Sequence, residues 1–135
     1  MIVLDASLTG AFFFEDEADA SVDQIIGRCA ETGATAPSIW TLEIANIFRM
    51  AVRRRRITAE QRSDYFERLR SIGVQIDVTS GDMAWRELTR LADHHDLTVY
   101  DAAYLELALR QRLPLATLDR ELAAAARREG VEVLP

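Results

Sequence analysis

Short apolar runs alternate with longer amphipathic segments along the whole chain. The first run, Ile2 to Leu4, is entirely apolar, which is typical of a strand buried on both faces of a parallel sheet. Strands are predicted at residues 2–4, 34–37, 74–78, 114–117 and 131–134. Helices are predicted directly after the first strand and at about residues 18–31, 38–56, 58–72, 82–94, 99–112 and 119–129. Since strands that alternate with helices require right-handed crossovers, we expect an α/β fold, a three-layer α/β/α sandwich with a mainly parallel central sheet.

No low-complexity linker, internal repeat or shift in composition divides the chain. Residues 1–135 are therefore expected to form a single domain, which is long enough to bury a core without staples. No apolar run approaches the roughly 20 residues of a membrane helix, and the first residues carry no export signal. The single cysteine, Cys29, cannot form an internal disulfide. These features predict a cytoplasmic protein with no membrane partner.

All 16 basic residues are arginines, and the chain contains no lysine. This excludes a Walker A phosphate loop and a Schiff base. It also argues against a phosphate-accepting receiver domain and a haloacid-dehalogenase-like phosphatase, since both need a lysine. The formal net charge of −6 disfavours nucleic-acid binding through a uniformly basic surface, so any such site has to be organised locally.

Four carboxylates lie close to the ends of predicted strands. Asp5 directly follows the first strand, and Asp119 follows the strand at 114–117. Glu43 and Asp101 lie near the starts of the helices that begin after Ser38 and Thr98. Because ligands bind outside the carboxyl ends of the strands in open α/β sheets, the sequence predicts that these acids share one edge.

Each acid alone also has a structural interpretation. Thr98 and Asp101 have the spacing of a capping box, Asp119 suits a helix N-cap, and Glu43 suits a helix dipole. Asp5 needs partners for its charge, because it ends a buried strand. Four gathered carboxylates repel one another unless a cation lies among them, and oxygen ligands of this kind suit Mg²⁺ or Mn²⁺. Such a cluster could activate a water molecule for phosphodiester hydrolysis.

Four stretches carry a recurring pattern around these acids: residues 2–7, 36–46, 97–104 and 115–119. Together they resemble the PIN-domain family and, within it, the VapC-type toxins of bacterial toxin–antitoxin pairs. The resemblance covers essentially the whole chain, in order. It implies a PIN-like fold and a metal-dependent endoribonuclease with Mg²⁺ (or Mn²⁺) as its cofactor.

The resemblance also assigns roles to residues. Asp5 and Asp101 correspond to the central metal ligands, and Glu43 and Asp119 complete the catalytic pocket, partly through metal-bound water. The supporting hydroxyl residues of the family correspond to Ser7 and Thr117. The family further implies RNA as substrate, a homodimer, and inhibition by a cognate antitoxin whose C-terminal segment occupies the groove.

Two alternatives stay open. One is a PIN-type nuclease that acts in RNA maturation outside a toxin system, which a small antitoxin-like reading frame directly upstream would argue against. The other is a catalytically silent PIN-like module that binds protein or RNA. Loss of the acids would indicate such a module, and all four acids are present.

Two further features are interpreted as structural. The run from Arg53 to Arg56 ends a predicted helix, where its charges offset the helix dipole, and we expect it to be solvated rather than bound to RNA. Adjacent His94 and His95 also end a helix. Because no third ligand is apparent near them in the sequence, we do not expect a metal there.

Overall fold

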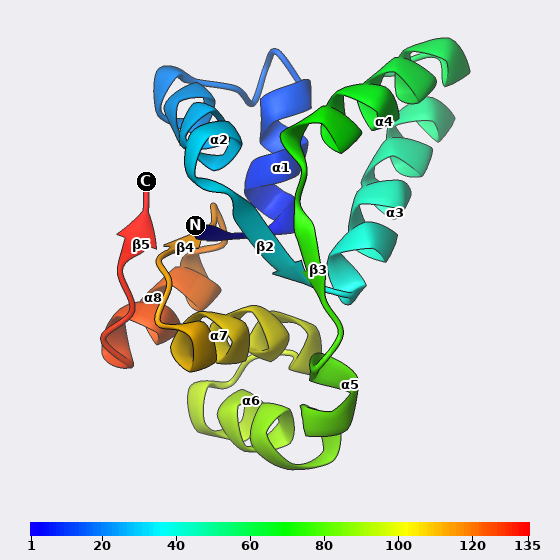
Figure 1. Cartoon of the computed structure of the whole chain (residues 1–135). Coiled ribbons are helices and arrows are strands. Elements are labelled where there is room, and N and C mark those ends of the chain that lie inside the picture. The colour runs from blue at the N-terminus through cyan, green and yellow to red at the C-terminus, as the bar shows by residue number, and fades with distance from the viewer.

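The computed structural model describes residues 1–135 and has a five-stranded sheet at its centre (Figure 1). The strands are β1 (Ile2–Leu4), β2 (Ala34–Pro37), β3 (Gln75–Asp77), β4 (Leu115–Ala116) and β5 (Val133–Leu134). Their order is β3-β2-β1-β4-β5, and every neighbouring pair is parallel. After the central strand β1, the chain adds β2 and β3 on one side of β1 within the sheet. It then crosses back and adds β4 and β5 on the other side of β1.

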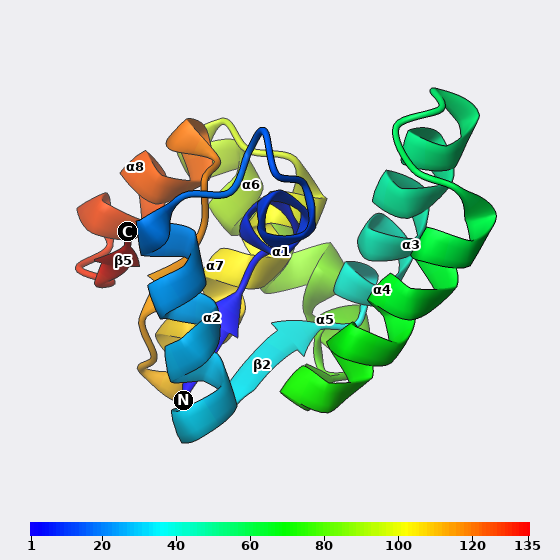
Figure 2. The ribbon, with the colours of Figure 1, turned by 90° about the horizontal axis from the view of Figure 1, so that it is seen from above.

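Helices connect the strands. They are α1 (Ala6–Phe13), α2 (Ala20–Thr32), α3 (Ile39–Arg53), α4 (Ala59–Ile72), α5 (Ser80–Met83), the π-helical segment η1 (Ala84–Leu88), α6 (Thr89–His95), α7 (Val99–Gln111) and α8 (Arg120–Arg128). In Figures 1 and 2, α1 and α2 lie on one side of the sheet, and α6 and α7 lie on the other. The pair α3 and α4 extends to one side as a hairpin.

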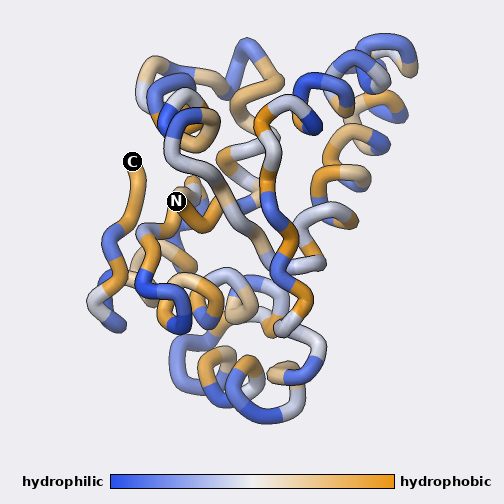
Figure 3. Tube along the Cα trace, viewed as in Figure 1, coloured by the Kyte–Doolittle hydropathy of each residue, from blue (hydrophilic) through white to orange (hydrophobic).

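The two faces of the sheet are buried in separate cores. Ile2 and Leu4 pack into a smaller core with α2, whereas Val3 between them belongs to a larger core that includes most of α7. This alternation is what period-2 side-chain geometry requires of a strand covered on both faces. Figure 3 shows β2 in pale colours of intermediate hydropathy and the outer parts of α2 and α6 as hydrophilic. The predicted three-layer α/β/α sandwich is confirmed. None of the helices combines the length and the apolar composition of a membrane-spanning segment.

The structure differs from the sequence prediction around residues 74–95. The predicted strand is confined to Gln75–Asp77 at the sheet edge, where Val78 is 77% exposed. The helix predicted at about 82–94 begins earlier and is not continuous, since a π-helical turn separates α5 from α6. Across the π-helical turn, the hydroxyl of Thr89, the first residue of α6, donates to the carbonyl of Ala84, the first residue of η1, at 2.7 Å. A hydrogen bond from a threonine hydroxyl to a backbone carbonyl five residues earlier is compatible with the wider π-helical turn. The apolar periodicity of the sequence does not reveal such a turn.

The helix N-caps agree with the prediction in part. Thr58 caps α4 with a complete capping box to Gln61, as a threonine before this helix suggests. Ser38 precedes α3, and a serine there is a typical N-cap, but it does not cap this helix: its backbone is already helical, and its side chain makes no capping hydrogen bond. The Thr41 hydroxyl instead donates to the Ser38 carbonyl at 3.0 Å. Glu43 is positioned by this helix all the same.

Candidate active site

Asp5 is fixed at the carboxyl end of β1, the central strand. It is only 4% exposed, and its backbone N–H donates to the Ala116 carbonyl of β4 at 3.0 Å. Its Oδ2 accepts a hydrogen bond from Thr117 Oγ1 at 2.7 Å and another from the Ser7 hydroxyl. The Thr9 hydroxyl donates to the Asp5 carbonyl at 2.9 Å. Burial raises the pKa of Asp5, and the two hydroxyl donors to its carboxylate act against that shift.

The same hydroxyls hold the loop that carries Asp119. Thr117 Oγ1 accepts from the Asp119 backbone N–H at 3.0 Å, and Ser7 Oγ accepts from the Leu118 N–H at 3.0 Å. Asp119 Oδ1 caps α8 by accepting from the Leu122 N–H at 2.8 Å. Ser7 and Thr117 therefore couple the ends of β1 and β4.

Glu43 reaches the same region from α3. Its Oε2 accepts a hydrogen bond from the hydroxyl of Tyr104, a fully buried residue of α7, at 3.3 Å. Burial raises the pKa of Glu43 to about 7, and the charges of Asp5 and Asp101 add to the increase, while the Tyr104 hydrogen bond opposes it. Glu43 thus lies within electrostatic range of two other candidate acids.

Asp101 lies in the first turn of α7. The Thr98 side chain caps this helix by accepting from the Asp101 backbone N–H at 3.1 Å. The Asp101 carboxylate does not complete the predicted capping box, because it makes no bond to the Thr98 backbone. Burial raises the pKa of Asp101, and the charges of Asp119 and Asp5 raise it further. A hydrogen bond from the Thr98 side chain opposes this increase, so the Asp101 carboxylate lies beside its own N-cap and within electrostatic range of two other acids.

The structure thus brings all four predicted acids to one edge of the sheet. Two of them, Glu43 and Asp101, are partly buried beside other carboxylates, an arrangement that a divalent cation would stabilise. No three of the four acids have ligand oxygens within 4.8 Å of one another, so they do not form a closed cage. Mg²⁺ does not require such a cage, because it usually binds through one or two carboxylates and keeps several waters.

A cavity of about 550 Å³ opens beside this edge, between α1 and α3. Ser7 and Leu118 line it close to the acids, and Arg54 and Arg56 also line it. Arg56 is neutralised, since it pairs with Asp16 at 2.8 Å and stacks over the Phe14 ring at 4.2 Å. Arg54 takes part in no ion pair. The arginine run, which we predicted to be solvated, is therefore divided by the structure into residues with different surroundings.

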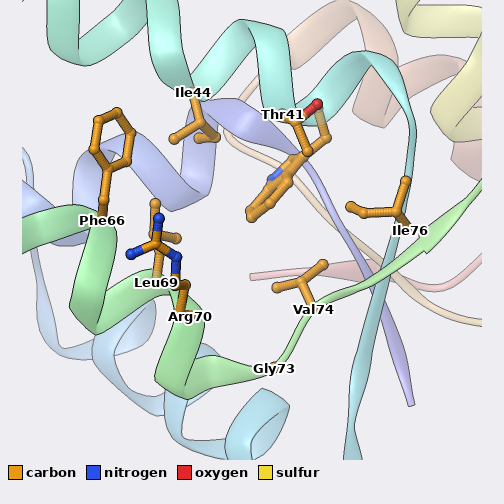
Figure 4. A pocket seen from close by; sticks show the side chains of 9 residues that line it. Thr41, Ile44, Phe66, Leu69, Arg70, Gly73, Val74 and Ile76 are labelled. Carbon is orange, nitrogen blue, oxygen red and sulfur yellow. The ribbon is translucent and has the colours of Figure 1, made fainter.

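A second pocket, of about 370 Å³, lies between α3, α4 and β3 (Figure 4). Its lining is mostly apolar and includes Trp40, Ile44, Leu69 and Ile76, with Arg70 as the one charged residue. Ile44 is the immediate neighbour of Glu43 in α3. The pocket therefore adjoins the helix turn that supplies one of the acids.

Sequence reasoning missed one residue of this site. Tyr104 connects α7 to the α3 acid, and it was not singled out because a tyrosine on a mostly apolar helix has the pattern of a core residue. A signal was present, because Tyr104 lies three residues after Asp101 and so on the same helix face.

Comparison with known proteins gives consistent results. The PIN domain family model matches residues 2–128. Ribonuclease VapC3 of Pyrobaculum aerophilum is 30% identical over 122 residues, which span 90% of this chain and 92% of the relative.

Two crystal structures share the fold. PAE2754 from Pyrobaculum aerophilum superposes with a TM-score of 0.71 at 26% identity, over 98% of this chain and 82% of that one. FitAcB from Neisseria gonorrhoeae superposes with a TM-score of 0.65 at 18% identity, over 100% and 97% of the two chains.

Proposed function

The chain belongs to the PIN-domain family, of the VapC type, and from this premise we propose that it is a metal-dependent endoribonuclease, the toxin of a toxin–antitoxin pair. The observation that carries the proposal is the gathering of Asp5, Glu43, Asp101 and Asp119 at the carboxyl ends of β1 and β4 and the starts of α3 and α7. The 30% identity to a protein named Ribonuclease VapC3 supports a ribonuclease. The acids supply a chemical reason for one.

The proposed roles follow from how each acid is held. Asp5 and Asp101 would bind Mg²⁺ or Mn²⁺ directly, and Glu43 and Asp119 would complete the pocket, partly through water. When bound, the ion supplies an activated water and positive charge for the leaving oxygen of an RNA phosphodiester. Ser7 and Thr117 keep the Asp5 carboxylate in one orientation, so that the ligand needs little reorganisation. The arrangement needs no side-chain nucleophile.

The proposal is tested by cleavage of a mixed RNA pool with Mg²⁺, Mn²⁺ or EDTA. We expect metal-dependent cleavage by the wild type and its loss in Asp5→Asn, which keeps the shape of the side chain. Asp64→Asn is the matched control, because Asp64 is an exposed acid of α4 without a hydrogen-bond partner. Absence of cleavage by the folded, antitoxin-free wild type would favour the catalytically silent binding module. Cleavage confined to one precursor RNA would favour RNA maturation.

We also propose a cognate antitoxin as partner. The pocket between α3 and α4 supports this, because its mostly apolar lining suits the apolar face of an amphipathic segment (Figure 4). A segment seated there would lie next to the turn that carries Glu43. Ile76→Glu, at a lining residue that is 38% exposed, should weaken antitoxin binding without preventing RNA cleavage.

A homodimer belongs to the same proposal. Large apolar residues are exposed next to three of the acids in the sequence: Leu42 is 67%, Tyr100 62% and Leu118 42% exposed. Apolar side chains gathered around a polar site are typical of an interaction surface.

A further inference from the structure

A second group of metal-binding side chains lies away from the acidic edge. His94 and His95 are the last two residues of α6, and Glu129 is the C-cap of α8. One ligand atom from each of the three lies within 4.8 Å of the others, and no other three His, Cys, Asp or Glu side chains in the chain meet this condition. We had expected no third ligand for the histidines; the fold supplies one from 34 residues further along the chain.

The surroundings of His95 indicate that its imidazole serves this cluster. The His95 side chain is only 3% exposed, and its Nε2 lies 2.7 Å from Glu129 Oε1. Its Nδ1 is buried and has no hydrogen-bond partner. The one polar contact of this buried ring is therefore made with a member of the cluster. An apolar residue would fill the same space without leaving a ring nitrogen unsatisfied.

His94 adds a second imidazole to the same place. Its ring centroid lies 4.6 Å from that of His95, with the planes at 83°. A hydrogen bond between His95 and Glu129 does not require this second ring, whereas a metal site does. Arg90, the nearby cation, is held by both carboxylate oxygens of Glu87. Its charge is thus largely offset.

We propose that His94, His95 and Glu129 bind a Zn²⁺ ion. Two imidazoles and one carboxylate form a known three-ligand set for zinc, with water in the fourth position. Ligand atoms around tetrahedral zinc lie about 3.4 Å apart, as bond lengths of roughly 2.1 Å dictate. The cluster reaches this spacing by rotation of the His94 and Glu129 side chains, of which the first is exposed and the second is 30% exposed.

This site differs from the acidic edge in place and in chemistry. Glu129 and Asp119 are at opposite ends of α8, about 15 Å apart at 1.5 Å per residue. Imidazole ligands favour zinc, whereas the carboxylates and water of the acidic edge favour Mg²⁺ or Mn²⁺. A zinc ion would join the end of α6 to the end of α8. It would thereby secure the segment that leads through Thr98 into the first turn of α7.

Zinc binding can be measured without any nuclease activity. The protein to use is the full chain with Asp5→Asn and Asp101→Asn, which weakens the acidic site as a competitor. It is stripped with EDTA, exchanged into buffer and titrated with Zn²⁺ or Co²⁺. We expect one ion per chain, with a visible Co²⁺ spectrum lacking a thiolate band, because the only cysteine, Cys29, is buried elsewhere. The two histidines of the chain should both shift in the imidazole region of the NMR spectrum.

Two variants identify the ligands. His94→Ala removes an exposed ligand, and Glu129→Gln keeps an acceptor for His95 while removing the charge. Each should weaken Zn²⁺ binding about a hundredfold, at least as much as the loss of a supporting residue at a metal site. Asp93→Asn, an exposed acid one residue before His94, should leave the affinity unchanged.

The proposal is overturned if the chain binds no stoichiometric Zn²⁺, or if both ligand variants bind it as tightly as their parent. In that case His95 and Glu129 form a hydrogen bond only. Because these measurements use a chain with a weakened acidic site and need no nuclease activity, they stand apart from the RNA cleavage test. Failure of either proposal would leave the other intact.

Discussion

At the end of β1, the orientation of the Asp5 carboxylate depends on two hydroxyl donors. Thr117→Val keeps the shape of the side chain but removes the 2.7 Å hydrogen bond to Asp5 Oδ2. We expect a loss of about 1–3 kcal/mol in the free energy of unfolding, because a buried acceptor loses a partner. RNA cleavage should fall as well, since the carboxylate is less well oriented. Urea denaturation and cleavage rates of the same samples measure both effects.

Thr32→Val is the control for this substitution. Thr32 is exposed at the end of α2, and its hydroxyl donates only to a carbonyl of its own helix. Its replacement should change stability by about 0.5 kcal/mol or less. Equal effects of the two substitutions would show that the hydroxyl of Thr117 has no special role at Asp5.

The pKa of Glu43 predicts a pH dependence of the metal-free protein. Folding raises this pKa from 4.5 to about 7, so the folded state binds the proton more tightly than the unfolded state. The resulting stabilisation is fully present below pH 4.5 and is lost as the pH rises through about 7. Since Glu43 is partly exposed, we expect about 1–2 kcal/mol after allowance for solvent screening.

The comparison that isolates this effect uses Glu43→Gln, which cannot ionise. Urea denaturation in EDTA at pH 5 and pH 8 should show a larger loss of stability at pH 8 for the wild type than for the variant. When Mn²⁺ replaces EDTA in the buffer, the loss of stability at pH 8 should be smaller, because a bound cation offsets the repulsion among the carboxylates. An identical pH response of the two proteins would contradict the assignment of the raised pKa to Glu43.

At the scale of the elements, the sequence predicts what depends on periodicity and chain order. The buried strand at 2–4 and the helices around Glu43 and Asp101 have clear apolar patterns, so the sequence alone predicts the four acids at one edge. The discontinuity at η1 could not be predicted, since it accompanies a hydrogen bond between Thr89 and Ala84. Nor could the meeting of His95 with Glu129, because it depends on how α6 and α8 pack.

The end of α3 gives a prediction about substrate binding. Arg54 lines the cavity next to the acidic edge, whereas Arg53, adjacent in sequence, does not. Arg54→Ala should therefore weaken RNA cleavage about tenfold, mainly through KM, if RNA phosphates pass through this cavity. The salt dependence of RNA binding by this variant should also decrease: the slope of the logarithm of affinity against the logarithm of salt concentration should be smaller by about 0.7, for one lost phosphate contact on single-stranded RNA.

Arg53→Ala removes the same charge from the same helix end and is the matched control. Cleavage kinetics of both variants at several salt concentrations separate a local contact from a general effect of net charge. If the two substitutions weaken cleavage equally, the cavity does not guide the RNA, and the solvated interpretation of the arginine run holds.

At the scale of the whole molecule, the exposed apolar surface bears on assembly. Trp85 in η1 is 95% exposed and Val78, after β3, is 77% exposed in the isolated chain. Exposure of such apolar side chains is unfavourable in water, and burying one the size of Val78 contributes about 1.5–3 kcal/mol. We therefore expect a second copy of the chain to cover Trp85 and Val78 as well as the exposed apolar residues beside the acids, and the purified protein to have about twice the 15.2 kDa mass of one chain.

Light scattering after size exclusion measures that mass, and Trp85 reports on the surface itself. The other tryptophan, Trp40, is buried at 7% exposure, so a red shift of the emission on dilution reports solvent reaching Trp85. Trp85→Glu should give a folded monomer, because a charge at the interface opposes burial, while Gln24→Glu on the exposed side of α2 should leave the dimer intact. A wild type that is monomeric at every concentration, with Trp85 in water, would leave this surface to the antitoxin or to RNA.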